Sequence, residues 1–215
     1  MHIVVLMVAM MTAQPSLAQA PPGGREKPIK LVVLGDSLSA GLGLPAAAAF
    51  PARLQKALKD KGINVDMTNA GVSGDTALGG RDRLDWSVPG GTDAVIVELG
   101  ANDALHGIDP KVTRGALADI VSRLKERGIA VMLCGMLAPP NNGSDYSARF
   151  EAIYFDVAKS FGVPLYPFFL DGVAANARLN QPDGIHPTAE GVEVIVKRIL
   201  PAVEAFIGTI GGQHT

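Results

Sequence analysis

The sequence predicts an α/β fold: a three-layer α/β/α sandwich around a mainly parallel, five-stranded sheet. Two patterns lead to this prediction. Short runs rich in Val, Ile and Leu alternate with longer amphipathic segments, which is typical of α/β proteins. The short runs are apolar at consecutive positions, which favours parallel strands covered by helices on both faces. We expect one domain over residues 29–208, followed by a flexible tail over residues 209–215.

The expected elements alternate along this domain. The expected strands are Ile29 to Leu34, Ile63 to Thr68, Ala94 to Leu99, Ile129 to Cys134 and Val163 to Tyr166. The expected helices are Ala47 to Lys61, Thr76 to Leu84, Pro110 to Arg127, Asp145 to Phe161 and Pro187 to Ile207. Gly62, Gly128 and Gly162 stand between a helix and the next strand, where glycine commonly ends a helix. Right-handed crossovers bring the loops that follow such strands to one edge of the sheet, where we expect the functional site.

The N-terminus differs in kind from the domain. Ile3 to Met11 is an unbroken apolar run, too short for a spanning helix, which needs about 20 residues. Small residues follow it at Ala18 and Ala20, as signal peptidase requires. We expect a signal peptide over residues 1–20, cleaved after Ala18 or Ala20, and a linker over residues 21–28. The prediction is a periplasmic or secreted protein with no stable membrane span.

Charge and cysteine content argue against a nucleic-acid-binding protein and against a disulfide-stabilised one. The chain has 19 basic and 21 acidic residues and a net charge of -2, without the basic stripe that neutralising phosphates would require. We therefore expect no nucleic-acid partner. Cys134 is the single cysteine, so no intramolecular disulfide can form. It lies in an apolar run and is expected to be a buried small hydrophobe rather than a nucleophile.

A candidate nucleophile follows the first expected strand. The strand leads directly into Gly35-Asp36-Ser37-Leu38-Ser39, which places the Ser37 hydroxyl at the active edge of the sheet. The GxSxG elbow does not fit, because Ser39 occupies the place of the second glycine. Since a serine in a glycine-bearing turn is common, this feature alone leaves an ordinary turn open.

A candidate base precedes the last expected helix. In Asp183-Gly184-Ile185-His186-Pro187 the glycine turn lets the Asp183 carboxylate reach the His186 ring. A neutral imidazole so oriented takes the serine proton and later returns it to the leaving group. The alternative is an Asp-Gly turn before a helix-capping histidine. His106 competes with His186 but lacks an acidic residue in a comparable turn, so we interpret it as a surface residue.

Two further loops follow the second and third expected strands. Acyl transfer needs hydrogen-bond donors aimed at the developing oxyanion. Gly71, within Asn69 to Asp75, offers a backbone N–H, and Asn102, within Gly100 to Asp103, offers a side-chain amide. Both sequences are also ordinary loop chemistry. Ser73 is a conceivable rival nucleophile, although nothing marks it as paired with a base.

Together, four blocks in order resemble those of the SGNH (GDSL) hydrolases: Gly35-Asp36-Ser37, Gly71, Gly100-Ala101-Asn102-Asp103 and Asp183-x-x-His186. The resemblance implies the flavodoxin-like α/β/α fold of that family. It also implies that Ser37 is the nucleophile, His186 the base and Asp183 its orienting partner. The oxyanion hole would be formed by the Ser37 and Gly71 amides with Asn102, while Asp36 would be a structural loop residue. Members of the family need no metal or cofactor.

The sequence is most similar to the periplasmic arylesterase, acyl-CoA thioesterase I and lysophospholipase group. This implies hydrolysis of short to medium acyl or aryl esters, with thioesters as further candidates, and an apolar groove for the acyl chain. The expected groove residues are Leu38, Leu78, Met136, Leu137 and Ile185, for which ordinary packing is the alternative. The chain departs from the group where Leu137 stands in place of a usual arginine.

Two other functions stay open at this point. A carbohydrate O-deacetylase of the same family would use the same triad. A non-catalytic, flavodoxin-like binding module would cradle a phosphate on the loop from Gly35 to Gly43, but it would leave Asp183 and His186 unexplained. The expected partner is a small-molecule acyl ester or thioester, and the oligomeric state is left open.

Overall fold

The structure is a computed structural model, and it describes residues 27–211 of the 215-residue chain. The expected signal peptide over residues 1–20 lies outside the described residues. So do residues 21–26 of the expected linker and residues 212–215 of the expected tail.

The sheet has the predicted parallel arrangement. Its strands are β1 (Ile29–Gly35), β2 (Val65–Gly71), β3 (Ala94–Glu98), β4 (Ala130–Cys134) and β5 (Leu165–Tyr166). They lie in the order β2-β1-β3-β4-β5, and each neighbouring pair is parallel. The chain reverses its direction of winding between β1 and β3, and ligands in such sheets bind at the carboxyl ends of the strands beside that point. The ends of β1 and β3 are therefore the natural place for a site.

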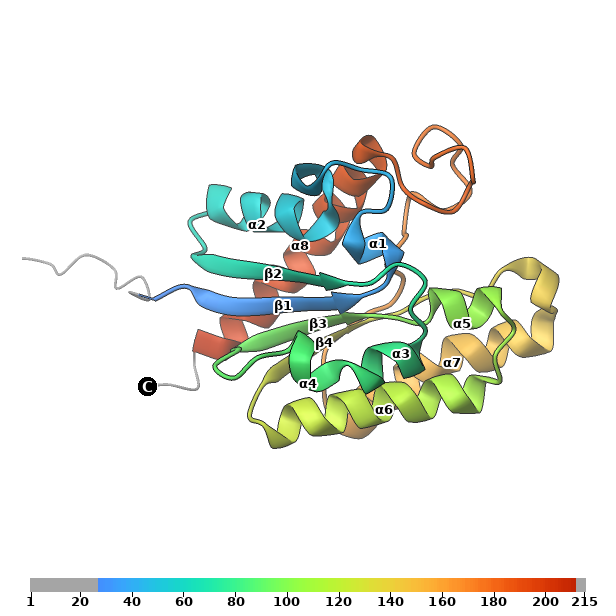
Figure 1. Cartoon of the computed structure of the whole chain (residues 1–215), viewed down its shortest axis with the longest axis horizontal. Helices are drawn as coiled ribbons and strands as arrows, with labels where there is room; N and C mark the ends of the chain where they lie inside the picture. Colours follow the sequence, from blue (N-terminus) through green and yellow to red (C-terminus); the bar gives the residue numbers. More distant parts are fainter. Residues whose placement is uncertain (1–26, 212–215) are drawn as a thin grey trace, which may run out of the picture.

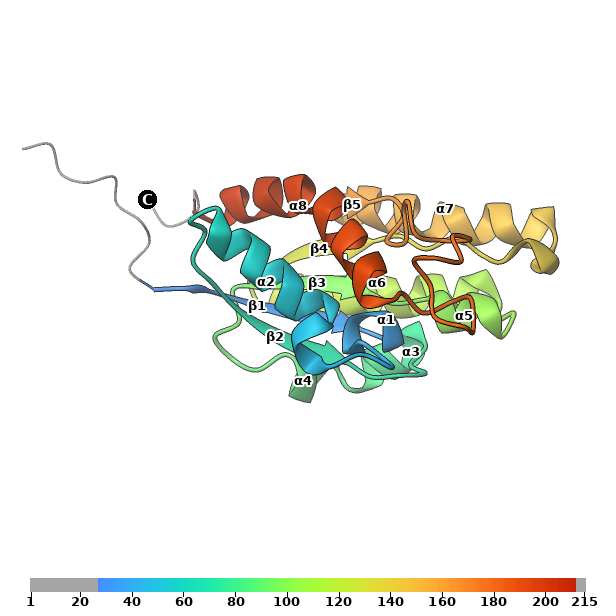
Figure 2. The same cartoon turned by 90° about the horizontal axis from the view of Figure 1, so that it is seen from above.

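Helices cover both faces of the sheet, which confirms the predicted α/β fold (Figure 1). They are α1 (Ser37–Ala40), α2 (Phe50–Asp60), α3 (Ala77–Asp82), α4 (Leu84–Ser87), α5 (Ala101–Leu105), α6 (Pro110–Glu126), α7 (Ser144–Phe161) and α8 (Ala189–Gly211). Figure 2 shows α2 and α8 side by side over one face, while α6 packs against α3 and α7 on the other. Among residues 27–211, no helix is long and apolar enough to cross a membrane.

The boundaries of several elements differ from the expected ones. The segment expected to be one helix over Thr76 to Leu84 is two short helices, α3 and α4, which meet at Arg83. Helix α2 starts at Phe50, where Pro51 suits the first turn, and a separate 3₁₀ turn precedes it at Ala46–Ala48. Helix α8 continues to Gly211, so the first residues of the expected tail are helical.

The core joins the sheet to its helical layers. Strands β1, β3 and β4 are buried along almost their whole length, as expected of strands that are covered on both faces. Phe50 of α2 meets Phe169 edge to face, with ring centroids 4.8 Å apart, and both side chains are fully buried. The segment after β5 is thereby anchored on the same side of the sheet as α2.

Candidate active site

Ser37 stands at the start of α1, directly after β1. The side chain of Asp36 accepts a hydrogen bond from the Leu38 amide at 2.9 Å and so caps the helix. The turn has no room for a side chain at Gly35, because a Cβ atom there would lie 2.2 Å from Oγ of Ser39. The packing of this turn therefore presents Ser37 at the carboxyl edge of the sheet.

His186 joins Ser37 to Asp183. Its Nε2 atom lies 2.8 Å from Ser37 Oγ, and its Nδ1 atom lies 2.7 Å from Asp183 Oδ2. A carboxylate only accepts hydrogen bonds, so Nδ1 carries the hydrogen and Nε2 is left to accept one from the serine hydroxyl. This is the geometry of a nucleophile, a base and the group that orients the base.

Asp183 keeps its charge at neutral pH. The backbone amides of His186 and Ile185 each donate to its Oδ1 atom at 3.0 Å. These amides, together with the His186 ring, lower the pKa of Asp183 to about 2. Gly184 makes the turn with a φ of +77°. The carboxylate is therefore ionised and available to stabilise a positive charge on the imidazole.

Gln181 ties the His186 loop to the loop after α1. Its backbone N–H donates to the His186 carbonyl at 2.7 Å. Its side-chain Nε2 donates to the Leu42 carbonyl at 2.7 Å and to the Pro187 carbonyl at 3.0 Å. One side chain thus links the two segments that carry the serine and the histidine.

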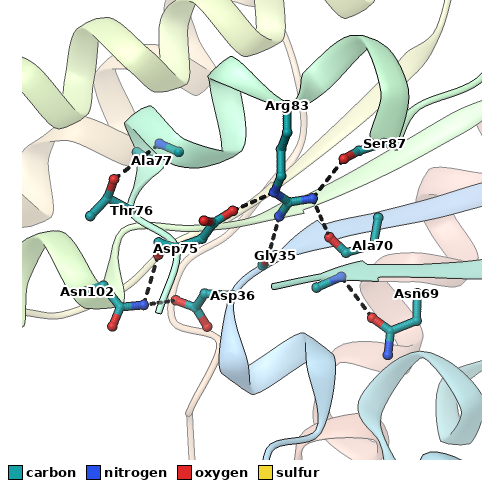
Figure 3. A network of polar contacts seen from close by, with 12 residues as sticks. Gly35, Asp36, Asn69, Ala70, Asp75, Thr76, Ala77, Arg83, Ser87 and Asn102 are labelled. Carbon is teal, nitrogen blue, oxygen red and sulfur yellow. Dashed lines mark hydrogen bonds and ion pairs between the residues drawn. The ribbon is translucent and has the colours of Figure 1, made fainter. Parts of the chain in front are cut away.

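Asn102 lies at the start of α5, after β3, and lines the same cavity as Ser37. Its amide nitrogen donates to the Asp75 carbonyl at 2.8 Å and to Asp36 Oδ2 at 3.3 Å (Figure 3). The longer contact is the weaker hydrogen bond. An oxyanion beside Ser37 can replace that contact while the bond to Asp75 keeps the amide oriented.

The structure does not support Gly71 as an oxyanion donor. Its N–H donates to Oδ1 of Asn69 at 2.9 Å, an Asx turn that leaves no hydrogen for a substrate. A Cβ at Gly71 would lie 2.3 Å from the Ala40 nitrogen, so the glycine serves close packing of β2 against α1. Further along this loop, the Gly74 N–H has no acceptor among the described residues, and Gly74 is exposed with a φ of +87°.

Two carboxyl groups are buried beneath the nucleophile turn. Burial raises the pKa of Asp36 to about 7, against the lowering effect of the Leu38 amide. Burial, and then the neighbouring Asp36, raise the pKa of Glu98 well above its usual range. Ser39 Oγ donates to Glu98 Oε2 at 2.7 Å. Asp36 thus lies inside the fold as a helix cap beside Asn102.

A cavity of about 490 Å³ opens beside Ser37 and His186. Of the expected groove residues, Leu38, Met136, Leu137 and Ile185 line it. Leu78 does not: it is an exposed residue of α3 outside the cavity lining, because the positions that this helix buries are Ala77 and Gly80.

Other parts of the cavity wall are not among the expected groove residues. They include Leu105, Ala138, Pro139, Pro140, Phe168, Leu170, Ala174 and Ala175. Most of them come from the loops after β4 and β5. An apolar side chain in a loop carries no periodic signal in the sequence, so only the fold reveals that these residues face Ser37.

The remaining candidates lie elsewhere. His106 and Ser73 are both exposed, and Cys134 is buried at the end of β4. Within the described part of the chain, no cluster of three or more His, Cys, Asp or Glu side chains is arranged to hold a metal ion.

Comparisons with known proteins identify the family. Residues 33–194 match the GDSL-like Lipase/Acylhydrolase family. The chain is 37% identical to Esterase TesA of Pseudomonas aeruginosa, over 82% of this chain and 89% of that protein. It is 41% identical to an arylesterase of Vibrio mimicus (75% and 81% covered) and 38% identical to Thioesterase 1/protease 1/lysophospholipase L1 of Escherichia coli K12 (80% and 84%). A crystal structure of TesA superimposes with a TM-score of 0.79 at 36% identity, over 82% of this chain and 99% of that one.

Proposed function

The chain belongs to the GDSL-like lipase/acylhydrolase family and is an ester hydrolase, and we propose that Ser37, His186 and Asp183 are its catalytic triad. One observation carries the proposal: a continuous line of hydrogen bonds runs from the Ser37 hydroxyl through the His186 ring to the Asp183 carboxylate. The line opens into a cavity that has room for an acyl chain.

The reaction follows from these positions. As Ser37 Oγ bonds to the acyl carbonyl carbon, its proton passes to His186 Nε2. The charged Asp183 stabilises the imidazolium that results, and the leaving alkoxide or phenoxide takes the proton from Nε2. A water molecule then attacks the acyl-enzyme with the same base, which releases the acid and restores the Ser37 hydroxyl.

The oxyanion needs donors on the side of Ser37 opposite His186. We assign this role to the Ser37 N–H, the Asn102 side-chain amide and, in place of Gly71, the Gly74 N–H. Asn102 is bonded to the carbonyl of Asp75, the residue after Gly74, so the two donors come from adjoining segments. Donors held in place before the reaction stabilise developing charge without reorganisation.

The cavity supports a neutral, apolar acyl group of short to medium length. Of the described residues that line it, none is Asp, Glu, Lys or Arg, and most are Leu, Ala, Pro, Met, Ile or Phe. An acyl chain buried there gains free energy roughly in proportion to the apolar area it covers. Aryl esters and thioesters present the same acyl carbonyl to Ser37, and both are included in the proposed substrate class.

The carbohydrate O-deacetylase is less well supported. A sugar needs several side chains that make hydrogen bonds, but the polar side chains of the lining are Ser37, His186, Asn102 and Asn180. The first three have roles in the proposed reaction. The Asn180 side-chain amide donates its hydrogens to the carbonyls of Val173 and Asn176.

The phosphate-binding module has no support. The buried carboxyl groups of Asp36 and Glu98 lie directly beneath the loop after β1. A phosphate cradle needs free backbone N–H groups at that place, but the amides of Leu38, Gly41 and Leu42 already donate to Asp36 and Ser37.

The test is hydrolysis of a p-nitrophenyl ester series from acetate to palmitate, with Ser37→Ala and His186→Ala beside the parent protein. Ser73→Ala and His106→Ala are the matched controls, because both residues are exposed and outside the cavity lining. We expect the first pair to lose activity and the second pair to keep it. A fully active Ser37→Ala protein contradicts the assignment, as does covalent labelling of Ser73 by an organophosphonate.

Export to the periplasm or the medium stays a proposal that rests on the apolar run Ile3 to Met11 and the small residues at Ala18 and Ala20. Cell fractionation with N-terminal sequencing tests it. A product shortened at Ala18 or Ala20 and found outside the cytoplasm supports export, and a full-length cytosolic product contradicts it.

A further inference from the structure

Arg83 is a buried cation beside the active-site loops. Only 8% of the residue is exposed, and its guanidinium group makes four hydrogen bonds (Figure 3). Nη2 donates to the Gly35 carbonyl at 2.8 Å. Nη1 donates to the Ala70 carbonyl at 2.8 Å and to Ser87 Oγ at 2.9 Å. Nε donates to Asp75 Oδ2 at 2.5 Å, which completes an ion pair. The Arg83 guanidinium group therefore binds the end of β1, the end of β2 and the loop that follows β2.

Two of these partners lead directly to the reacting atoms. Gly35 ends β1 and lies two residues before Ser37. Asp75 is held by Arg83 through its side chain, and its own carbonyl accepts the Asn102 amide at 2.8 Å. A single side chain thus connects the strand that presents the nucleophile to the residue that orients Asn102.

A guanidinium group is suited to this task in a way that other side chains are not. Its donors lie in one rigid plane, so it can bridge acceptors on separate segments, whereas a lysine presents a compact point charge. Burying a cation is expensive unless carbonyl or carboxylate groups surround it, so the arrangement contributes little net stability. Its effect lies in the relative positions that it imposes on its partners.

We propose that Arg83 is a positioning residue for the oxyanion hole, which acts through Gly35 on the Ser37 turn and through Asp75 on the Asn102 amide. The inference rests on the proposed function. It assigns Arg83 no contact with the substrate. If Arg83 has this role, displacement of its guanidinium group weakens binding of the transition state more than binding of the substrate.

The test compares Arg83→Lys with the parent, using p-nitrophenyl butyrate and active sites counted by organophosphonate labelling. Arg123→Lys is the matched control. Arg123 lies on the same side of the sheet and donates to the Arg81 carbonyl and the Asp85 carboxylate, but to none of the active-site loops. For Arg83→Lys we expect kcat per active site to fall about tenfold or more, the loss expected when oxyanion donors are displaced, with KM within about twofold. Affinity for a trifluoromethyl ketone, which forms a tetrahedral oxyanion on Ser37, should fall in parallel with kcat.

A second variant keeps the test decisive if Arg83→Lys does not fold. Asp75→Asn removes the charged partner but leaves the carbonyl that binds Asn102, and we expect it to lower kcat with KM unchanged. Because Arg83→Lys already breaks the connection through Asp75, the double variant should lose no more activity than Arg83→Lys alone.

Several results would overturn the inference. The first is a kcat per active site within about twofold of the parent in a folded Arg83→Lys or Asp75→Asn protein. The second is a change in KM with kcat unaltered. The third is a double variant whose loss of kcat equals the product of the two single losses. The pH midpoints of activity should match those of the parent, since Arg83 touches neither His186 nor Asp183. An inactive parent protein refutes the proposed function itself, whereas an active parent with an equally active Arg83→Lys variant refutes only the role of Arg83.

Discussion

Asp183 contacts His186 at two places: its Oδ1 atom accepts the His186 backbone amide at 3.0 Å, and its Oδ2 atom pairs with the ring Nδ1 at 2.7 Å. One carboxylate therefore sets both the path of the loop and the orientation of the ring. The contact between Asp183 and Nδ1 keeps the hydrogen on Nδ1 and so sets the tautomer of His186. The opposite nitrogen, Nε2, lies 2.8 Å from Ser37 Oγ and is free to accept its hydrogen.

Replacing Asp183 with Asn should preserve the turn but disturb the tautomer. We expect kcat to fall by roughly 10²–10⁴-fold, because the amide cannot stabilise an imidazolium as a carboxylate does. The pKa of Asp183 is lowered to about 2, so the parent keeps this carboxylate ionised at every pH of the test. Steady-state kinetics between pH 5 and 9 tests this, and a variant within twofold of the parent would remove Asp183 from the mechanism.

Replacing Asn102 with Ala should reduce turnover without weakening substrate binding. Its amide is assigned to the oxyanion, and removal of one such donor lowers kcat by about 10²–10³-fold. Asn142→Ala is a suitable control, since Asn142 also donates its amide to a backbone carbonyl, that of Ala104, but lies outside the cavity lining. An Asn102→Ala protein in which only KM changes would contradict the assignment.

The parallel sheet follows from the apolar runs, and parallel strands deliver the loops that follow them, with Ser37, to one edge. The contact of Ser37 with His186 does not follow from these runs, because β5 ends at Tyr166 and His186 lies just before α8. It is the resemblance to the SGNH hydrolases that implies this contact.

Gly71 shows where prediction from sequence stops. The sequence predicts a free backbone N–H there because glycine has no side chain, but Oδ1 of Asn69 accepts that hydrogen. The expectation for Leu78 is wrong for a related reason, since α3 buries Ala77 and Gly80 and leaves Leu78 exposed. Both errors concern side-chain contacts over a few residues, which residue types and their spacing do not determine.

The size of the cavity should set the preferred acyl length. Ala174 lines the cavity, while Ala177 in the same loop is exposed and does not line it. Ala174→Phe fills part of the space, so we expect the p-nitrophenyl ester optimum to move to shorter chains with acetate hydrolysis almost unchanged. Ala177→Phe should keep the parent's profile. If both variants show the same optimum as the parent, the acyl chain binds elsewhere.

The buried Asp36 should make the protein less stable as the pH rises. Its pKa is raised from 3.8 to about 7, mainly by burial, with Asp103 and Asp75 adding to the rise and His186 opposing it. The folded state therefore binds the proton more tightly than the unfolded state, so this contribution to stability is complete below pH 4 and is lost as the pH rises through 7. For one such group the loss between pH 5 and 8 is roughly 2–3 kcal/mol.

Asp36→Asn should remove this loss. The amide oxygen can still accept the Leu38 N–H that caps α1, and the side chain no longer ionises inside the fold. Urea unfolding at pH 5 and pH 8 measures the difference, with Asp60→Asn as a control at an exposed carboxylate. We expect the free energy of unfolding of the parent and of Asp60→Asn to drop between the two pH values, and that of Asp36→Asn to drop by less. Equal drops in all three proteins would mean that Asp36 is already ionised at pH 5, and that the Asn102 amide stabilises its charge more strongly than the 3.3 Å contact suggests.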